Sequence, residues 1–180
     1  MSLFKHDFKE ILVSQMAALL GGTVVGSLLA LYTDKLLLIP GMLILLPGFL
    51  EMRGNISGTF AARLTSGLFL SVIKPDHIKS RIIKGNLIAS FLLAIAVSGL
   101  LGVIAFTFSY ITLHIFMPRI ILLPLLAGLI ANTIEITLTL FGTLYFFKRG
   151  NDPNNIMGPI ITSTGDFTSV LALLIAVVII

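Results

Sequence analysis

The chain has 180 residues, of which 57% are hydrophobic and only 11% charged, and its mean hydropathy is +1.08. This composition excludes an ordinary soluble domain, and the absence of cysteine excludes disulfides and thiolate metal sites. The net charge of +4 is typical of basic loops on the inner side of a membrane protein, so no nucleic-acid partner is predicted. We predict one all-α domain over residues 1–180, embedded in a lipid bilayer.

The first predicted membrane span covers residues 11–32 and follows a short amphipathic lead-in. It contains Gly22 and Gly26, four residues apart, a spacing that indicates a face for close helix packing. A short polar turn is expected at residues 33–35.

The second apolar segment, residues 36–73, is too long for one simple crossing. As a single helix it would extend about 57 Å, nearly twice the thickness of the hydrocarbon layer. Pro47 and Gly54 lie inside it and favour a kink or a break. We therefore expect a long, broken second helix, with a span over 36–56 and an extension on the inner side to residue 73.

Polar residues recur every four positions along this segment and therefore share one helix face: Glu51, Asn55, Thr59 and Arg63. Two interpretations of this face stay open. It lines a path for a ligand, or Glu51 is neutralised within the protein by Arg53 or Arg63.

Three further spans are predicted over residues 82–110, 120–147 and 155–180. Small residues at every fourth position of the first predict a helix-packing face: Ser90, Ala94, Ser98 and Gly102. A polar stripe on the second surrounds an acid: Asn132, Glu135, Thr139 and Gly142. The third follows a helix-start signal, Asp152 before Pro153, and carries Asp166.

Basic residues predict the orientation of these five spans. If the N-terminus is inside, the inner side holds eight of them: Lys5, Lys9, Lys74, Lys79, Arg81, Lys84, Lys148 and Arg149. The outer side then holds only Lys35 and Arg119. By the positive-inside rule we expect a multi-pass protein of the plasma membrane with its N-terminus in the cytoplasm and its C-terminus outside.

Three carboxylates fall within the predicted hydrocarbon layer, those of Glu51, Glu135 and Asp166. Asp166 lies about 15 Å along a helix that starts near Ile156, close to the middle of the bilayer. A carboxylate at that depth costs about 3 kcal/mol, so it normally faces a cation or a wet cavity. The plainer alternative is that Asp166 hydrogen-bonds a neighbouring helix, and Glu135 is also open to a coupling role or to pairing with Arg63.

The side chains that accompany these acids bear oxygen and no sulfur: Asn55, Asn132, Thr162 and Ser163. Such a set favours a hard cation, Mg²⁺ or Ca²⁺ or Na⁺. We predict Asp166, Thr162, Glu135 and Glu51 as metal ligands. Gly54, Asn55, Asn132 and Ser163 are predicted to line the path or its gate. Because Mg²⁺ is often held through water by one or two carboxylates, one Asp166 per chain, doubled in a dimer, suits it.

Two other classes of protein compete with a transporter. A membrane enzyme lacks support, because the chain has no H-E-x-x-H or G-x-S-x-G motif, no cysteine and no phosphate-binding glycine loop. An assembly subunit explains the stripes of small residues but not three carboxylates in hydrocarbon.

Two stretches resemble magnesium transporters. Residues 45–68, LLPGFLEMRGNISGTFAARLTSGL, resemble a segment of the SLC41 magnesium carriers, and Gly54–Asn55 match the Gly-Asn pair of the related MgtE channels. Residues 152–166, DPNNIMGPIITSTGD, resemble the entry to the last transmembrane helix of MgtE. Gln15 lies where the SLC41 repeat carries a Gln before its first span.

The resemblance implies an MgtE-like transmembrane domain of five helices that pairs around a cation path. Asp166 would be the pore ligand, Asn55 would lie near the inner gate, and Thr162 would be a neighbouring ligand. The chain is similar to a half-size, single-repeat member of prokaryotic or archaeal type, without the N-terminal and CBS domains of MgtE. It departs from SLC41 members at Ser57, where they carry an acid, and has Glu51 instead.

We therefore expect a homodimeric Mg²⁺ transporter with Asp166 as the central ligand. The alternatives are a Na⁺- or H⁺-coupled exchanger of the SLC41 type and a membrane assembly subunit that transports nothing.

Overall fold

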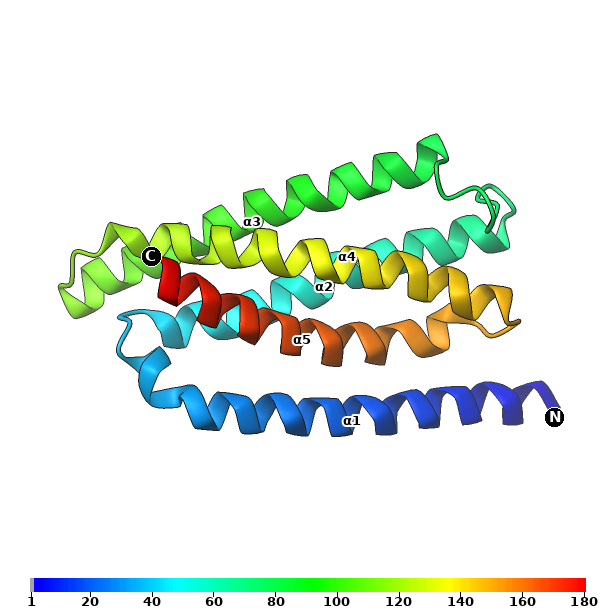
Figure 1. Cartoon of the computed structure of the whole chain (residues 1–180), viewed down its shortest axis with the longest axis horizontal. Coiled ribbons are helices and arrows are strands. Elements are labelled where there is room, and N and C mark those ends of the chain that lie inside the picture. Colours follow the sequence, from blue (N-terminus) through cyan, green and yellow to red (C-terminus); the bar gives the residue numbers. More distant parts are fainter. Residues whose placement is uncertain (1) are drawn as a thin grey trace.

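The computed structural model describes residues 2–180, with side chains from His6 onward, as a bundle of long helices (Figure 1). The elements are α1 (Ser2–Leu37), α2 (Met42–Phe69), α3 (Arg81–Leu113), the 3₁₀ helix η1 (Pro118–Ile121), α4 (Leu122–Lys148) and α5 (Pro153–Ile179). Successive long helices run in opposite directions, so the two ends of the chain lie at opposite ends of the long axis (Figure 1). The described part contains no strand, which confirms the predicted all-α class.

Polar residues and glycine set the helix ends. Asp152 caps α5, because its Oδ1 accepts a hydrogen bond of 2.9 Å from the backbone N–H of Asn154, and Pro153 follows at the first helical position. Ser80 caps α3 in the same way through Ile83. The predicted start of the last helix is therefore confirmed to within two residues.

The boundary between α1 and α2 differs from the prediction. α1 continues to Leu37, five residues beyond the expected end at 32, and the chain then reverses at Gly41, whose φ is +80°. Glycine adopts that left-handed conformation without the steric cost that a Cβ atom brings. The second helix therefore begins at Met42 rather than at residue 36.

The expected break within the second segment does not occur. α2 is one continuous helix of 28 residues that includes Pro47, and it ends at Phe69 rather than at residue 73. Pro47 lies in the second turn, close enough to the start of the helix that the lost N–H bond interrupts little of the ladder. With the reversal placed at residues 38–41, the segment needs no break to fit its length.

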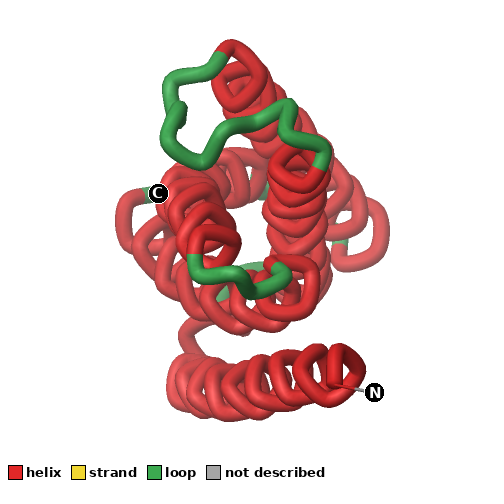
Figure 2. The backbone as a smooth tube through the Cα atoms, turned by 90° about the vertical axis from the view of Figure 1, so that its right-hand side faces the viewer, coloured by secondary structure: helices red, strands yellow, loops and turns green. Residues whose placement is uncertain are grey.

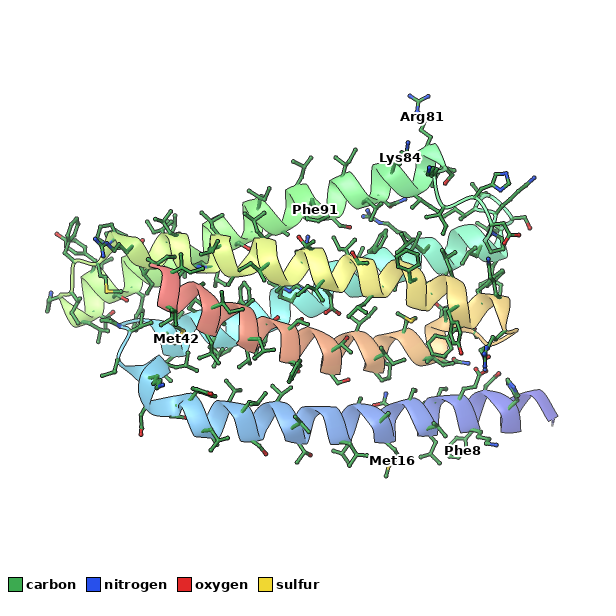
Figure 3. The ribbon with its side chains drawn as sticks, in the orientation of Figure 1. Phe8, Met16, Met42, Arg81, Lys84 and Phe91 are labelled. Atoms are coloured by element: carbon green, nitrogen blue, oxygen red, sulfur yellow. The ribbon has the colours of Figure 1, made fainter. Side chains whose placement is uncertain are left out.

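α2 lies inside the bundle and α1 lies on its outside. α2 packs against α3, α4 and α5, whereas α1 packs along α5 and touches α2 only slightly. An end-on view shows α1 set apart from the other four helices (Figure 2). Met16 projects from the side of α1 that faces away from the bundle, and it is 54% exposed (Figure 3).

The core has two apolar parts with a polar layer between them. Towards the turn at Gly41, α2, α4 and α5 contribute Phe49, Ala127 and Leu173 among others. Towards the opposite end, Phe60 and Leu140 belong to a second apolar cluster. Buried polar residues separate the two clusters near the middle of their helices: Arg53, Ser57, Asn132, Glu135 and Ser169.

The small-residue stripe on α3 is a packing face, as predicted. Ser90, Ala94 and Ser98 are at most 4% exposed, and Gly102 is also buried. A Cβ atom on Gly102 would lie 2.7 Å from the carbonyl oxygen of Ile121, so only glycine allows α3 this close to the start of α4.

Four helical segments of the described chain are long and apolar enough to cross a membrane: His6–Leu37, Arg81–Leu113, Pro118–Lys148 and Pro153–Ile179. α2 is not among them, because charged and polar residues interrupt its apolar run. The start of α1, the α2–α3 connection and the α4–α5 turn lie at one end of the bundle (Figure 1). This is the arrangement that the predicted grouping of basic residues requires; Arg81 and Lys84 project at that end (Figure 3).

Candidate functional site

A buried ion pair joins α2 to α4 near the middle of the bundle. Arg53 Nη2 lies 3.7 Å from Glu135 Oε2, and both side chains are 1% exposed. The same guanidinium donates hydrogen bonds to Asn132 Oδ1 at 3.2 Å and to the carbonyl oxygen of Ala131 at 2.8 Å. Three groups of α4 thus hold one cationic side chain of α2, and Arg53 Nε is left without a partner among the described residues.

Glu135 is also held from α5. Thr164 Oγ1 donates to Glu135 Oε1 at 3.5 Å, and Thr168 Oγ1 donates to Oε2 at 3.3 Å. Gly165 lies between these two threonines, and a Cβ atom on it would be 3.3 Å from the carboxylate carbon of Glu135. The missing side chain at residue 165 is what lets α5 approach the acid.

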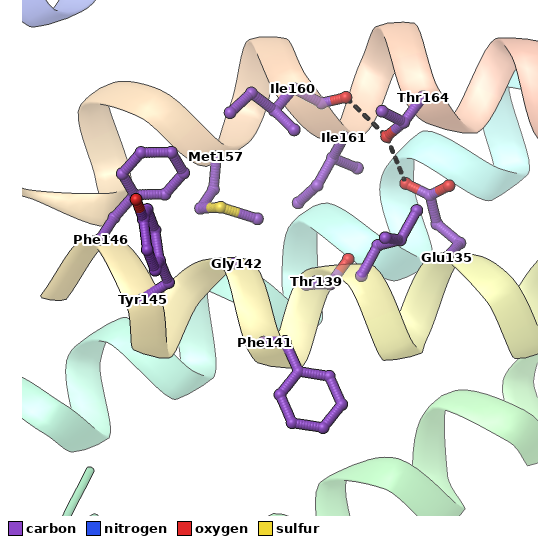
Figure 4. Close-up of a pocket in the computed structure, with 11 residues that line it drawn as sticks. Glu135, Thr139, Phe141, Gly142, Tyr145, Phe146, Met157, Ile160, Ile161 and Thr164 are labelled. Atoms are coloured by element: carbon purple, nitrogen blue, oxygen red, sulfur yellow. Dashed lines mark hydrogen bonds between the residues drawn. The ribbon is translucent and has the colours of Figure 1, made fainter. Parts of the chain in front are cut away.

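A cavity of about 360 Å³ lies between α4 and α5 and ends at this acid (Figure 4). Its walls are mainly apolar, with Met157, Ile161 and Phe141 among them, and Thr164 lies beside Glu135 at one end (Figure 4). The apolar walls provide few ligand oxygens beyond those of Glu135 and its two threonine neighbours, Thr139 and Thr164.

Two further carboxylates lie on the open side of the bundle. Glu51 is exposed on α2 and accepts a hydrogen bond of 3.1 Å from Asn55 Nδ2. Asp166 is half-buried on α5, the helix that packs against α2. Within the described residues, no basic side chain comes within 4.0 Å of either acid. Two of the predicted metal ligands therefore lie on neighbouring helices, and no basic side chain of the described residues pairs with either.

The other predicted site residues divide between this open side and the interior. Thr162 is exposed one turn before Asp166, and its hydroxyl donates to the carbonyl oxygen of Gly158 at 3.1 Å. Gly54 has no atom within 4 Å of the place a Cβ would take. Asn132, by contrast, is fully buried beside Arg53, and Ser163 packs against Gly21 of α1. Asn132 thus belongs to the buried polar layer, and Ser163 to the contact between α1 and α5.

The charge pairing differs from every pairing considered for the sequence. Glu51 pairs with neither Arg53 nor Arg63, and Glu135 pairs with Arg53 rather than with Arg63. From the sequence, Arg53 is considered only as a partner of Glu51, whereas Arg53 lies on the opposite side of α2 from Glu51 and Asn55. The sequence does contain a pattern that predicts the burial of Arg53, because this residue shares its helix face with Phe49 and Phe60. A lone arginine on an apolar face needs a buried anion.

The comparisons with known proteins fit this arrangement. The family model for MgtE, described as a divalent cation transporter, matches residues 46–176. The chain belongs to the MgtE family. No curated protein and no solved structure matches it.

The matched segment runs from the start of α2 almost to the end of α5 and leaves out α1. It contains Glu51 and Asp166 of the open side and the buried Arg53–Glu135 pair. Family membership identifies the chain as a divalent cation transporter of the membrane rather than an enzyme, as the resemblance implied. The match to a divalent cation transporter thus agrees with the hard cation that the oxygen-bearing side chains favour.

Proposed function

We propose that this protein moves Mg²⁺ across the membrane along the open face formed by α2 and α5. The observation that carries the proposal is the placement of two acids, Glu51 and Asp166, on the neighbouring helices α2 and α5. Glu51 lies about 14 Å and Asp166 about 20 Å from the start of its helix, and neither has a cationic partner within the described chain. Two carboxylates with water in the remaining positions are a coordination set typical of Mg²⁺.

Asp166 is the central ligand in this proposal, and Glu51 is the second acid. Thr162 lies next to Asp166 along the same helix and supplies a hydroxyl or a carbonyl oxygen. Asn55 orients Glu51 through its hydrogen bond and lines the path, where Gly54 leaves room for the ion and its water.

A second copy of the chain completes the path. The face that carries Glu51 and Asn55 is exposed, and Gly54 and Gly58 on it have nothing within 4 Å of a Cβ position. A charged residue facing lipid at mid-membrane costs about 3 kcal/mol, and a partner avoids that cost. Glycines at i and i+4, here half-buried, also favour close helix approach. A homodimer paired through this face would enclose a water-filled path between two sets of carboxylates.

The proposal includes five crossings of the plasma membrane. α2 runs the length of the bundle beside α4, so it crosses wherever its neighbours cross (Figure 1). Its polar face is shielded by the partner and its buried arginine by Glu135. The basic end of the bundle then faces the cytoplasm, which places the N-terminus inside and the C-terminus outside.

A flux measurement tests the transport. Purified protein is reconstituted into liposomes that contain a magnesium-sensitive dye, and wild type is compared with Asp166→Asn and Glu51→Gln. We expect Asp166→Asn to abolish the flux and Glu51→Gln to reduce it by about tenfold or more. Asp76→Asn, a change of an acid in the α2–α3 connection, is the control and keeps the wild-type rate. Flux that survives Asp166→Asn rules the proposal out.

The absence of cysteine allows a clean test of the paired copies. Gly58→Cys places one thiol on the proposed interface, and Leu92→Cys places one on an exposed position of α3, where residue 92 is 62% exposed. In native membranes we expect a disulfide-linked dimer from the first variant and not from the second. The reverse pattern contradicts the proposed interface.

A further inference from the structure

Arg53 and Glu135 form a closed electrostatic unit inside the bundle. Both oxygens of Glu135 accept hydrogen bonds from α5, and one of them also faces Arg53 Nη2 at 3.7 Å. The backbone of Gly165 packs against the same carboxylate, because a Cβ atom on this residue would lie only 3.3 to 3.4 Å from the carboxylate atoms. Glu135 therefore has its cation already, and that cation is part of the protein.

The acidic side chains near the middle of the bundle outnumber the basic one. Each chain has three carboxylates there, those of Glu51, Glu135 and Asp166, and one buried guanidinium, and the charges of the interior Arg53–Glu135 pair cancel. In each copy of the chain, the charge that remains is that of the two acids on the open side, Glu51 and Asp166. An unpaired charge in this interior would be costly, whichever partner were removed.

The hydrogen bonds of Arg53 also fix the rotation of α2. Residues two apart in a helix lie about 200° apart around its axis, so Arg53 and Asn55 project to opposite sides. The guanidinium is anchored to the carbonyl oxygen of Ala131 and to Asn132 Oδ1. As long as that anchor holds, Asn55 and Glu51 must face outward, on the side of Asp166.

We propose that Arg53 is a tethered cation that keeps the transported ion off Glu135 and holds α2 in the rotation that presents Glu51 and Asn55 to Asp166. Arg53 is thus a positioning residue and Glu135 is its counter-ion, not an ion ligand. The inference rests on the proposed transport path, because Glu51 and Asp166 are the acids left for the ion.

Carbodiimide labelling of the wild-type protein in liposomes tests the assignment without any variant. The modified residues are identified by mass spectrometry with and without Mg²⁺. We expect Mg²⁺ to protect Asp166 and Glu51 and to leave the labelling of Glu135 unchanged. Protection of Glu135 by Mg²⁺ overturns the inference alone, whereas Asp166 left unprotected overturns the proposed path. The two failures are therefore distinguishable.

Kinetics of paired variants test the positioning role. Glu135→Gln leaves the buried guanidinium uncompensated, so we expect the apparent KM for Mg²⁺ to rise by about tenfold, within the usual range of coupling energies. The double variant Arg53→Gln/Glu135→Gln removes both charges and should return KM to within about threefold of wild type, with only the maximal rate lowered. If Glu135 binds the ion, the double variant has a KM at least as high as Glu135→Gln, and the inference fails.

Discussion

Gly21 of α1 packs directly on Ser163 of α5. A Cβ atom on residue 21 would lie 2.7 Å from the Cβ of Ser163, a separation that real side chains do not reach. Nearer the N-terminal end, Ser14 Oγ donates to the carbonyl oxygen of Asn155 at 3.0 Å. α1 is therefore held along α5 by a few specific contacts, while most of its remaining surface is exposed.

Gly21→Ala should weaken the docking of α1. The added methyl group must push α1 away from α5 or displace Ser163, and overpacking of this kind costs about 1–3 kcal/mol. We expect the midpoint of thermal unfolding in detergent to fall by about 2–8 °C. Gly22→Ala is the matched control, because nothing lies within 4 Å of its Cβ position and alanine is the better helix former. Equal midpoints for the two variants would show that the close contact is not formed.

Gly165→Ala should disturb the other close approach of α5, at Glu135. The new methyl group would lie 3.3 Å from the carboxylate carbon of Glu135. It would push α5 away from that carboxylate and lengthen the hydrogen bonds from Thr164 and Thr168. We expect a loss of stability of about 1–2 kcal/mol, measured by denaturant unfolding in detergent micelles. Gly158→Ala, on the same helix with open space around it, serves as the reference. A Gly165→Ala protein as stable as Gly158→Ala contradicts the packing described here.

The sequence predicted those features that depend on local pattern. The last three predicted spans agree with α3, α4 and α5 to within about three residues at each end. Apolar run length and helix-start signals such as Asp152–Pro153 act locally, so the sequence carries them. The stripe from Ser90 to Gly102 was a packing face for the same reason, since its spacing alone places it on one side of α3.

Other features depend on which helices become neighbours. The pairing of Arg53 with Glu135 joins residues 82 positions apart in the chain and follows from the rotation of α2 against α4. Gly22 and Gly26 have the spacing that is typical of close helix packing, yet it is Gly21 that contacts Ser163 of α5. The side of α1 that meets α5 is set by tertiary packing. The turn at Gly41 was missed since the apolar residues around it continue both helical patterns.

Glu10 is predicted to hold the N-terminal part of α1 against the α4–α5 turn. Its two carboxylate oxygens accept hydrogen bonds from Asn151 at 2.6 Å and from Asn155 at 3.1 Å, and its side chain is only 7% exposed. Glu10→Ala removes both acceptors, so hydrogen exchange at the start of α1 should quicken by about tenfold. Asp7→Ala, at a side chain that is 54% exposed, should change exchange little. Similar exchange in the two variants would show that Glu10 does not restrain α1.

The contact between Asp76 and Lys148 should make the α2–α3 connection sensitive to pH. Lys148 Nζ donates to Asp76 Oδ1 at 2.7 Å, and this hydrogen bond together with the positive charge lowers the pKa of Asp76. Because the folded pKa is the lower one, the contact contributes fully above the ordinary aspartate pKa of about 3.9 and is lost as pH falls through the lowered value.

A spin label at Ile78→Cys, the sole thiol of such a protein, would report this change as increased mobility on acidification. The same label in an Asp76→Asn background should be mobile at every pH, because the amide lacks the charge that holds Lys148. High salt should produce part of the same loosening at neutral pH, since both side chains are exposed and their attraction is screened. Equal mobility of the label in the two proteins at neutral pH and low salt would show that the ion pair does not restrain the connection.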